Sequence, residues 1–325
     1  MLRRGELTAA AASRRIDPPP VAAALLDQAC AAYLGLAIGD ALGASVEFLT
    51  PNEIRHQYGV HRELSGGGWL HLKAGQVTDD TTMSLALGEA ILATGRVAAG
   101  SAAEAFDAWM RGKPVDIGNT VRRNLIQYRR TGDPQAPACA HDAGNGAAMR
   151  VLPVALACYG RPAAATIDAS RAQAHVTHHN ALSDAACETL IFMLQDCLAA
   201  VAAPAADLVG MLRQRAGALV DAQPLFAFQA RRCENPSGYV VDTLQAVLQA
   251  FFATDRFEDC LVDVVNRGGD ADTTGAIAGM LAGARYGLAA IPGRWLAGLD
   301  PLIRQRSSAQ AAALIALSQA ADTCA

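Results

Sequence analysis

Aromatic residues are scarce in this sequence: they fill 5% of its 325 positions, whereas 52% of the residues are hydrophobic. A core built largely from small side chains favours closely packed helices, because alanine is the best intrinsic helix former. Alternating β-branched and aromatic residues, which mark strands, are also scarce. We therefore predict an all-α fold, a compact single-domain helical bundle.

A surplus of positive charge is also lacking, since the formal net charge is −4 and the isoelectric point is about 6.0. Nucleic acid is therefore not an expected partner, because its phosphates are neutralised by many lysines and arginines. The chain has no uninterrupted run of about 18 apolar residues, so no membrane span is expected.

Cysteine pairs of the CxxC type are missing, which removes support for structural zinc. Eight cysteines are scattered along the chain, at positions 30, 139, 158, 187, 197, 233, 260 and 324. In a chain of this size they indicate buried, reduced thiols rather than a disulfide framework. We therefore expect a cytoplasmic protein.

The chain divides into a short tail and one long helical part. Residues 1–21 carry four arginines and a proline triplet, and they lack the apolar segment of a secretory signal, so we predict a disordered tail. Residues 22–325 show no break in composition and are predicted to be one helical domain. Glycines 35, 39 and 43 in its first helix should let a neighbouring element approach closely.

The spacing of apolar residues predicts where the helices lie. Residues 50–59 and 63–75 are predicted to form an irregular connection. Helices are predicted over residues 21–48, 81–95, 101–111, 117–130, 145–158, 165–175, 182–201, 205–220, 238–253, 257–266, 273–286 and 306–321.

Two short acidic segments stand out because charged residues make up only 18% of the chain. One reads VTDDTT over residues 77–82 and the other GGDADTT over residues 268–274, each just before an apolar run. Asp and Thr are ordinary helix N-caps, and the start of a helix favours negative charge. Capping explains one oxygen at each helix start, but not paired carboxylates flanked by hydroxyls.

If the two segments converge, their carboxylates repel one another and need a counter-charge. A divalent cation would supply it, and all-oxygen donors suit Mg²⁺, Mn²⁺ or Ca²⁺ rather than zinc or copper. The remaining ligands of an EF-hand loop are missing, which argues against a calcium sensor. Six donors are many for one ion that keeps its waters, so we predict a dinuclear site. The predicted metal ligands are Thr78, Asp79, Asp80, Asp270, Asp272 and Thr273.

Other polar residues interrupt apolar surroundings between these segments. Asp116 and Asn119 lie at the opening of a predicted helix. The segment DAGNG, residues 142–146, precedes another, where exposed backbone N–H groups would bind an anion, although Asn-Gly is also a common turn. Three nearby histidines, His175, His178 and His179, leave structural and functional roles equally open.

The ordered set of motifs resembles the ADP-ribosylglycohydrolase family over about residues 28–300. The segments that carry the resemblance are LGLAIGDALGASVEF, GQVTDDTTMSLALGEAIL, VDIGNT, HDAGNGAAMR, THHNALSDAAC, SGYVVDTLQ and NRGGDADTTGAIAGMLAGARYG. The family implies an all-α fold with a dinuclear Mg²⁺ or Mn²⁺ centre at the base of a cleft. Its metal motif falls on the same six residues.

The resemblance also implies roles for individual residues. Glu47 and Asp116 match acidic residues at the reacting centre and would be catalytic, with the choice of proton carrier open between them. Where the family has a second histidine and a proline after His178, this chain has Asn180 and Ala181. The implied substrate-binding residues are Asn119, Asp142, Gly144, Asn145, Gly146, His178 and Tyr239.

The implied reaction is hydrolysis of the N-glycosidic bond between ADP-ribose and an arginine of a target protein. Within the family the match is best to the bacterial enzymes that act on dinitrogenase reductase, which implies this partner and a role in regulating nitrogen fixation. Further regulatory protein partners stay open. The alternatives are a hydrolase of an O-linked or small-molecule ADP-ribose derivative and a non-catalytic ADP-ribose-binding relative, which the retention of all six ligands disfavours. If the protein were instead a metal-free glycosidase that uses two carboxylates, its activity would survive removal of metal by a chelator.

Overall fold

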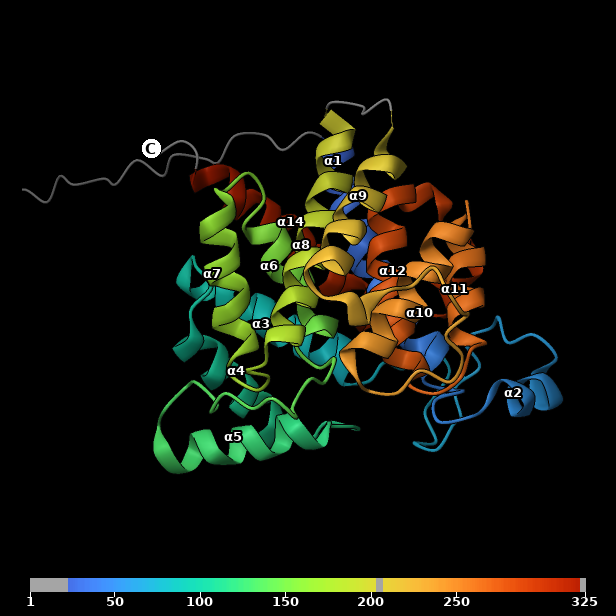
Figure 1. Cartoon of the computed structure of the whole chain (residues 1–325), viewed down its shortest axis with the longest axis horizontal. Coiled ribbons are helices and arrows are strands. Elements are labelled where there is room, and N and C mark those ends of the chain that lie inside the picture. Colours follow the sequence, from blue (N-terminus) through green and yellow to red (C-terminus); the bar gives the residue numbers. More distant parts are fainter. Residues whose placement is uncertain (1–22, 203–206, 322–325) are drawn as a thin grey trace, which may run out of the picture.

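Two helices that are far apart in the sequence form the centre of the molecule (Figure 1). The computed structural model describes residues 23–202 and 207–321. Helix α1 spans Ala23–Gly43 and helix α12 spans Ala271–Tyr286. Every residue over 31–43 of α1 and over 271–284 of α12 is buried. The predicted tail, residues 1–21, lies outside the described residues.

Other helices surround this central pair. They are α2 (Pro51–Tyr58), α3 (Asp79–Thr94), α4 (Ala99–Arg111), α5 (Asn119–Thr131), α6 (Leu152–Ala157), α7 (Ala163–Ala174), α8 (Ala181–Ala202), α9 (Leu208–Ala222), α10 (Val240–Ala253), α11 (Phe257–Val265), α13 (Gly293–Gly298) and α14 (Pro301–Ala321). Short 3-10 helices are η1 (Ala148–Arg150), η2 (Pro224–Phe226) and η3 (Leu288–Ala290). Within the described ranges there is no β-strand, only two isolated bridges. One apolar cluster extends from Leu25 to Ile315, so the prediction of a single all-α domain is confirmed.

Glycines allow α1 and α12 to pack with their backbones in contact. A Cβ atom on Gly39 would lie 1.9 Å from the carbonyl oxygen of Gly275, and one on Gly35 would lie 2.1 Å from that of Gly279. At Gly43 the nearest atom would be the carbonyl oxygen of Ala271, 2.0 Å away. The predicted close approach at glycines 35, 39 and 43 is confirmed, and its partner is α12.

The prediction of one helix over residues 145–158 is wrong. The structure has a loop, then η1 and α6, separated at Val151. Pro153 lies in the first turn of α6, where a missing N–H is tolerated, whereas a longer helix would place this proline in its interior. The loop ends in a turn in which the Asn145 carbonyl accepts from the N–H groups of Ala148 and Met149, and Asn145 lines the cleft described below.

Residues 50–59 were expected to be irregular, but they contain α2. Thr50 and Glu53 form a capping box, in which each side chain accepts from the other residue's backbone N–H. Pro51 occupies the first helical position, which suits its fixed φ. The first predicted helix also ends earlier than expected, at Gly43 rather than residue 48, and turns follow.

Helix α1 has the length and mean hydropathy, 1.2, of a helix that could cross a membrane. However, 78% of the most apolar window is buried inside the protein. Core helices of globular proteins share this composition, and α1 occupies that position here.

The close crossing predicts opposite effects of alanine at two helical glycines. Gly39→Ala should lower the free energy of unfolding by about 2 kcal/mol or more, because the added methyl group meets backbone that cannot yield locally. Gly217→Ala, in α9, is the matched control: nothing lies within 4 Å of its new Cβ, so the helix should gain roughly 0.5–1 kcal/mol. Urea denaturation followed by circular dichroism measures both, and equal effects would contradict the packing argument.

Candidate metal centre and active-site cleft

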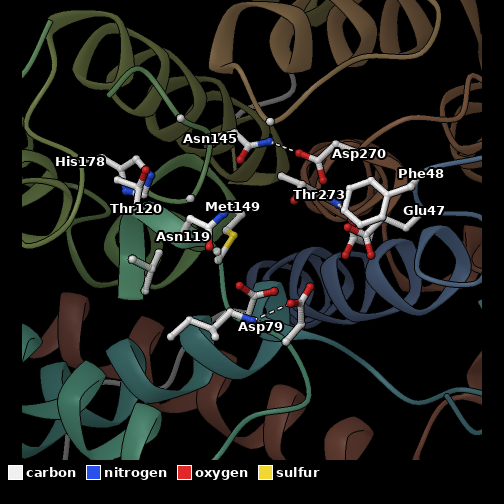
Figure 2. A pocket seen from close by; sticks show the side chains of 18 of the residues that line it. Glu47, Phe48, Asp79, Asn119, Thr120, Asn145, Met149, His178, Asp270 and Thr273 are labelled. Carbon is white, nitrogen blue, oxygen red and sulfur yellow. Dashed lines mark hydrogen bonds between the residues drawn. The ribbon is translucent and has the colours of Figure 1, made fainter. Parts of the chain in front are cut away.

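A cleft of about 450 Å³ opens where the N-terminal ends of α3, α5 and α12 meet. Figure 2 shows its acidic and amide side chains facing a common space. Helix N-termini carry partial positive charge and favour anions. The lining residues are Glu47, Phe48, Trp69, Asp79, Asp116, Ile117, Gly118, Asn119, Thr120, Val121, Gly144, Asn145, Gly146, Met149, His178, Gly238, Asp270, Asp272 and Thr273.

The two acidic segments converge at the floor of this cleft. The Thr78 hydroxyl lies 3.4 Å from an Asp272 carboxylate oxygen, and the Thr273 hydroxyl lies 3.4 Å from an oxygen of Asp80. Asp79 and Asp270 line the cleft itself, whereas Thr78 and Asp80 are buried beneath it. All six residues predicted as metal ligands therefore belong to one cluster.

The helix-capping alternative does not account for these residues. Thr78 is the N-cap of α3 and Asp270 is the N-cap of α12, but neither side chain accepts a capping hydrogen bond from its helix. The oxygen atoms that an N-cap would use are directed elsewhere, toward the other acidic segment or its neighbours.

Asp40 of α1, which sequence analysis did not identify, takes over the capping role at α3. Its carboxylate accepts hydrogen bonds from the backbone N–H groups of Thr78 and Thr81, at 2.9 Å and 3.0 Å, and from both hydroxyls. Burial raises the pKa of Asp40 to about 6, and these hydrogen bonds oppose the rise. Asp40 therefore orients the acidic turn from below. A carboxylate inside the long apolar run over residues 29–43 of α1 is the signal that could have revealed it.

Three carboxylates are placed to share a cation. Glu47, Asp270 and Asp272 each offer an oxygen atom, and these atoms lie within 4.8 Å of one another. Glu47 lies in the turns that follow α1, while Asp270 and Asp272 open α12, so the crossing of the central helices brings them together. Glu47, first identified through the family resemblance, is thus part of the acidic cluster.

Burial and mutual repulsion disfavour the charged form of five carboxyls in this cluster, those of Glu47, Asp79, Asp80, Asp270 and Asp272. Burial first, then the negative charges of Asp116 and Asp40, raises the pKa of Asp79 to about 7. Burial, followed by the charges of Asp270, Asp116 and Asp79, raises the pKa of Glu47 to about 8, against a hydrogen bond from Trp69. The pKa values of Asp80, Asp270 and Asp272 are also raised, with burial as the largest cause.

The donor set fits a divalent cation. The Oδ1 atom of Asp80 is fully buried and has no hydrogen-bond partner within the described structure, a state that costs free energy unless a further group approaches. Oxygen donors from carboxylates and hydroxyls are those that hard divalent cations prefer. A bound cation would supply both the missing partner and the missing positive charge, so this acidic group could hold metal.

Comparison with known proteins identifies the family. The family model for ADP-ribosylglycohydrolases matches residues 22–324. This chain belongs to the ADP-ribosylglycohydrolase family. The resemblance drawn from the ordered motifs is therefore confirmed.

Several relatives of this family member are similar over most of their length. ADP-ribosyl-[dinitrogen reductase] glycohydrolase of Rhodospirillum rubrum is 49% identical, covering 90% of this chain and 97% of the relative. ADP-ribosylarginine hydrolase Tri1 of Serratia proteamaculans is 34% identical, covering 86% and 76%. A solved structure, described as an ADP-ribosylglycohydrolase-related protein complex, superposes with a TM-score of 0.78 at 38% identity over 90% of this chain and 99% of that one.

The loop over residues 144–146 of this ADP-ribosylglycohydrolase connects the cleft wall to the acidic cluster. The Asn145 amide donates to an Asp270 carboxylate oxygen at 2.6 Å and to the Thr243 hydroxyl at 2.9 Å. A Cβ atom on Gly144 would lie 2.9 Å from the His178 ring, so glycine permits this contact. Burial lowers the pKa of His178 to about 3, which keeps the ring neutral.

Of the remaining residues that were predicted to bind substrate or to be catalytic, some line the cleft and others do not. Asn119 opens α5, as predicted from the sequence, and it lines the cleft together with Asp116. Asp142 and Tyr239 are not among the lining residues. Asp142 forms an ion pair with Arg123, whose hydrogen bond lowers its pKa, and Tyr239 forms a bridge with Gly144. The substrate-binding roles of these residues stay predictions.

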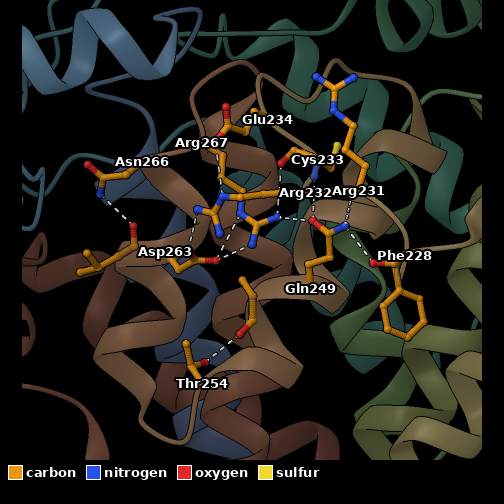
Figure 3. A network of polar contacts seen from close by, with 12 residues as sticks. Phe228, Arg231, Arg232, Cys233, Glu234, Gln249, Thr254, Asp263, Asn266 and Arg267 are labelled. Atoms are coloured by element: carbon orange, nitrogen blue, oxygen red, sulfur yellow. Dashed lines mark hydrogen bonds and ion pairs between the residues drawn. The ribbon is translucent and has the colours of Figure 1, made fainter.

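A buried polar network fixes the chain just before the second acidic segment (Figure 3). The Arg267 guanidinium pairs with Asp263 and donates to Gln249 Oε1 at 2.6 Å, although only 1% of this side chain is exposed. The backbone carbonyl of Arg267 accepts from Asn235 N–H, and Asp270 N–H donates to the Pro236 carbonyl, both at 2.8 Å. Arg267 therefore helps to position Asp270, a role with no signal in the local sequence.

The raised carboxyl pKa values predict how pH and a cation affect stability. A carboxyl whose pKa is higher in the folded state stabilises the fold below its unfolded pKa and loses this contribution as pH rises through the folded value. The ordinary values are 3.8 for Asp40 and Asp79 and 4.5 for Glu47, and the folded values are about 6, 7 and 8. The loss therefore extends from about pH 4 to pH 8, and the contributions of Asp79 and Glu47 still fall above pH 6. The metal-free protein should become less stable across this interval, and Mg²⁺ should raise its melting temperature more at pH 8 than at pH 6.

Differential scanning calorimetry at both pH values, with EDTA or with Mg²⁺, measures this effect. Asp272→Asn removes one of the repelling charges and one donor, so it should reduce the difference between the two pH values. A cation effect that is equal at pH 6 and pH 8 in the unmodified protein would contradict the electrostatic account.

Proposed function

We propose that this chain hydrolyses the N-glycosidic bond that joins ADP-ribose to an arginine side chain of a protein, with two Mn²⁺ or Mg²⁺ ions in its cleft. The observation that carries the proposal is the convergence of both acidic segments and Glu47 in one cleft of an ADP-ribosylglycohydrolase. A non-catalytic binding protein has no need of crowded buried carboxylates, which cost stability.

The names of the relatives support an arginine linkage. The relative from Rhodospirillum rubrum is named for ADP-ribosylated dinitrogen reductase, and the relative from Serratia proteamaculans is named for ADP-ribosylarginine. Because the first is 49% identical and is covered over 97% of its length, we take dinitrogenase reductase as the target protein. Removal of its ADP-ribose would reverse a regulatory modification.

Thr78, Asp79, Asp80, Asp270, Asp272 and Thr273 would hold the cations, with Glu47 beside them. Bound divalent ions would supply Lewis acidity at the ribose hydroxyls and offset the negative charge of the crowded carboxylates. The three helix N-termini and the 144–146 backbone would receive the negatively charged parts of ADP-ribose. The chain's own carboxylates then remain for the proton transfers.

Departure of arginine requires a proton on the guanidine, while the ribose carbon gains positive, oxocarbenium-like character. Glu47 and Asp116 are the two candidates for moving the proton, and both line the cleft. Glu47 Oε2 accepts a hydrogen bond from the Trp69 indole at 2.7 Å, and Asp116 Oδ1 accepts one from Ile117 N–H at 2.7 Å. The negative lining of the cleft also stabilises the developing positive charge.

The cysteines support work in a reducing compartment. All seven described cysteines are free thiols, and the eighth, Cys324, lies outside the described residues. Burial raises the pKa of the Cys187, Cys197 and Cys260 thiols, which keeps them protonated and unreactive. We therefore place the enzyme in the cytoplasm, where its protein target would be found.

Release of ADP-ribose from arginine-ADP-ribosylated dinitrogenase reductase is the direct test. We expect release with Mn²⁺, loss of release with EDTA, and recovery when Mn²⁺ is restored. Asp270→Asn should lower kcat/KM at least about 100-fold, because even outer partners of metal ligands contribute 10- to 100-fold.

Asp255→Asn is a suitable control, because Asp255 is exposed in the turn after α10, and it should leave the rate unchanged. Activity that survives EDTA in the unmodified enzyme would contradict metal dependence. Absence of release, together with hydrolysis of an O-linked ADP-ribose ester, would assign the cleft to that linkage instead.

A further inference from the structure

Two aromatic side chains at the rim of the cleft are exposed without an evident role in folding. Phe48 is 62% exposed and Trp69 is 50% exposed, and both line the cleft. Their ring centroids are 5.5 Å apart, with an angle of 45° between the rings. Figure 2 shows the Phe48 ring next to the Glu47 carboxylate. Their exposure leaves ring surface available to a ligand.

The backbone holds both rings in place at some cost. Phe48 has φ of 63°, in the left-handed region that costs a non-glycine residue about 1–2 kcal/mol. Its N–H donates to the Gly269 carbonyl at 2.7 Å, next to the acidic segment of α12. Trp69 follows Gly68, where a Cβ atom would lie 2.5 Å from the Ala44 carbonyl oxygen. A strained, fixed and exposed aromatic residue is typical of a functional position.

The indole of Trp69 is also connected to the reacting centre. Its Nε1–H donates to Glu47 Oε2 at 2.7 Å. This bond fixes one oxygen of Glu47 and leaves the other free to face the cleft. Glu47, in turn, belongs to the carboxylate group that could share a cation with Asp270 and Asp272.

The charge around these rings favours a cation as their ligand. Among the described residues, the cleft lining contains no lysine or arginine, and the buried His178 ring is neutral. Glu47 and Asp116 line the cleft on the same side as the rings, so carboxyl groups rather than basic side chains surround the aromatic faces. Aromatic faces attract cations, and a planar guanidinium stacks on them well.

Within the proposed function, on which this inference rests, we infer that Phe48 and Trp69 form a platform that receives the guanidinium of the modified arginine beside Glu47. The platform selects the arginine linkage, since an ester or phosphate adduct of ADP-ribose has no cation at this position. Trp69 has a second role as the residue that positions Glu47.

Product inhibition separates the platform from the ADP-ribose site. Agmatine carries the guanidinium without ADP-ribose, and free ADP-ribose carries no guanidinium. In Phe48→Leu and Trp69→Leu, the inhibition constant of agmatine should rise about 3- to 30-fold, the range of one or two cation–π contacts. The inhibition constant of ADP-ribose should stay within about twofold, because its binding surfaces are intact.

Conservative variants test each role. Phe48→Tyr keeps the ring and should restore most of the agmatine affinity lost in Phe48→Leu. Trp69→Phe keeps a ring face but removes the N–H donor that holds Glu47, so it should lower kcat while KM and the inhibition constant of agmatine stay within about twofold. Tyr58→Leu is the control, since Tyr58 is a partly exposed aromatic residue of α2 that makes an edge-to-face contact with His61, outside the cleft lining.

Equal loss of agmatine and ADP-ribose affinity in the leucine variants, or no loss of either, would overturn the inference. A melting temperature close to that of the unmodified enzyme shows that each variant folds. If the unmodified enzyme releases no ADP-ribose from the arginine-linked substrate but binds free ADP-ribose, the proposed function fails. If the unmodified enzyme releases ADP-ribose normally, but Phe48→Leu and Trp69→Leu affect agmatine inhibition no more than Tyr58→Leu does, the inference alone fails.

Discussion

Backbone contact between α1 and α12 is the constraint on which the rest of the structure depends. Gly35 and Gly39 of α1 pack directly against carbonyl groups of Gly279 and Gly275 of α12. Larger side chains at this crossing would separate the helices by several ångströms. The two ends that meet at the cleft carry Asp40 on one helix and the Asp270 segment on the other. The spacing of small residues in the core therefore sets the spacing of carboxylates in the site.

The buried carboxyls of the site destabilise the fold, and packing elsewhere in the molecule must compensate. Burial and mutual repulsion raise the pKa values of its carboxyls, and the large apolar cluster around the central helices must offset this cost. Specific hydrogen bonds reduce the cost of burying these carboxyls: Asp40 caps α3, Asn145 donates to Asp270, and Trp69 donates to Glu47. These bonds hold the carboxylates in fixed positions, and such preorganisation of polar groups favours catalysis.

Local sequence chemistry predicted much of the fold and the acidic site. The six donors from Thr78 to Thr273 were predicted because paired carboxylates with hydroxyls exceed what helix capping needs. In contrast, α2 was missed because its apolar pattern is weak and only the Thr50–Glu53 capping box marks it. The helix expected over residues 145–158 failed because periodicity alone does not weigh Pro153 against the loop that precedes it.

The sequence by itself determined the helical class, since small apolar residues recur at helical spacing, and it determined which oxygen donors are available, since their identities need no partner. Only the tertiary structure decided which residues act on those donors. Asp40 and Trp69 lie 38 and 22 residues along the chain from the groups that they hold. Arg267 is close to Asp270 in sequence, but it is fixed by Gln249, which lies 18 residues away. Their roles depend on contacts across the α1–α12 crossing and the loops around it, and such contacts arise from packing in three dimensions rather than from local spacing.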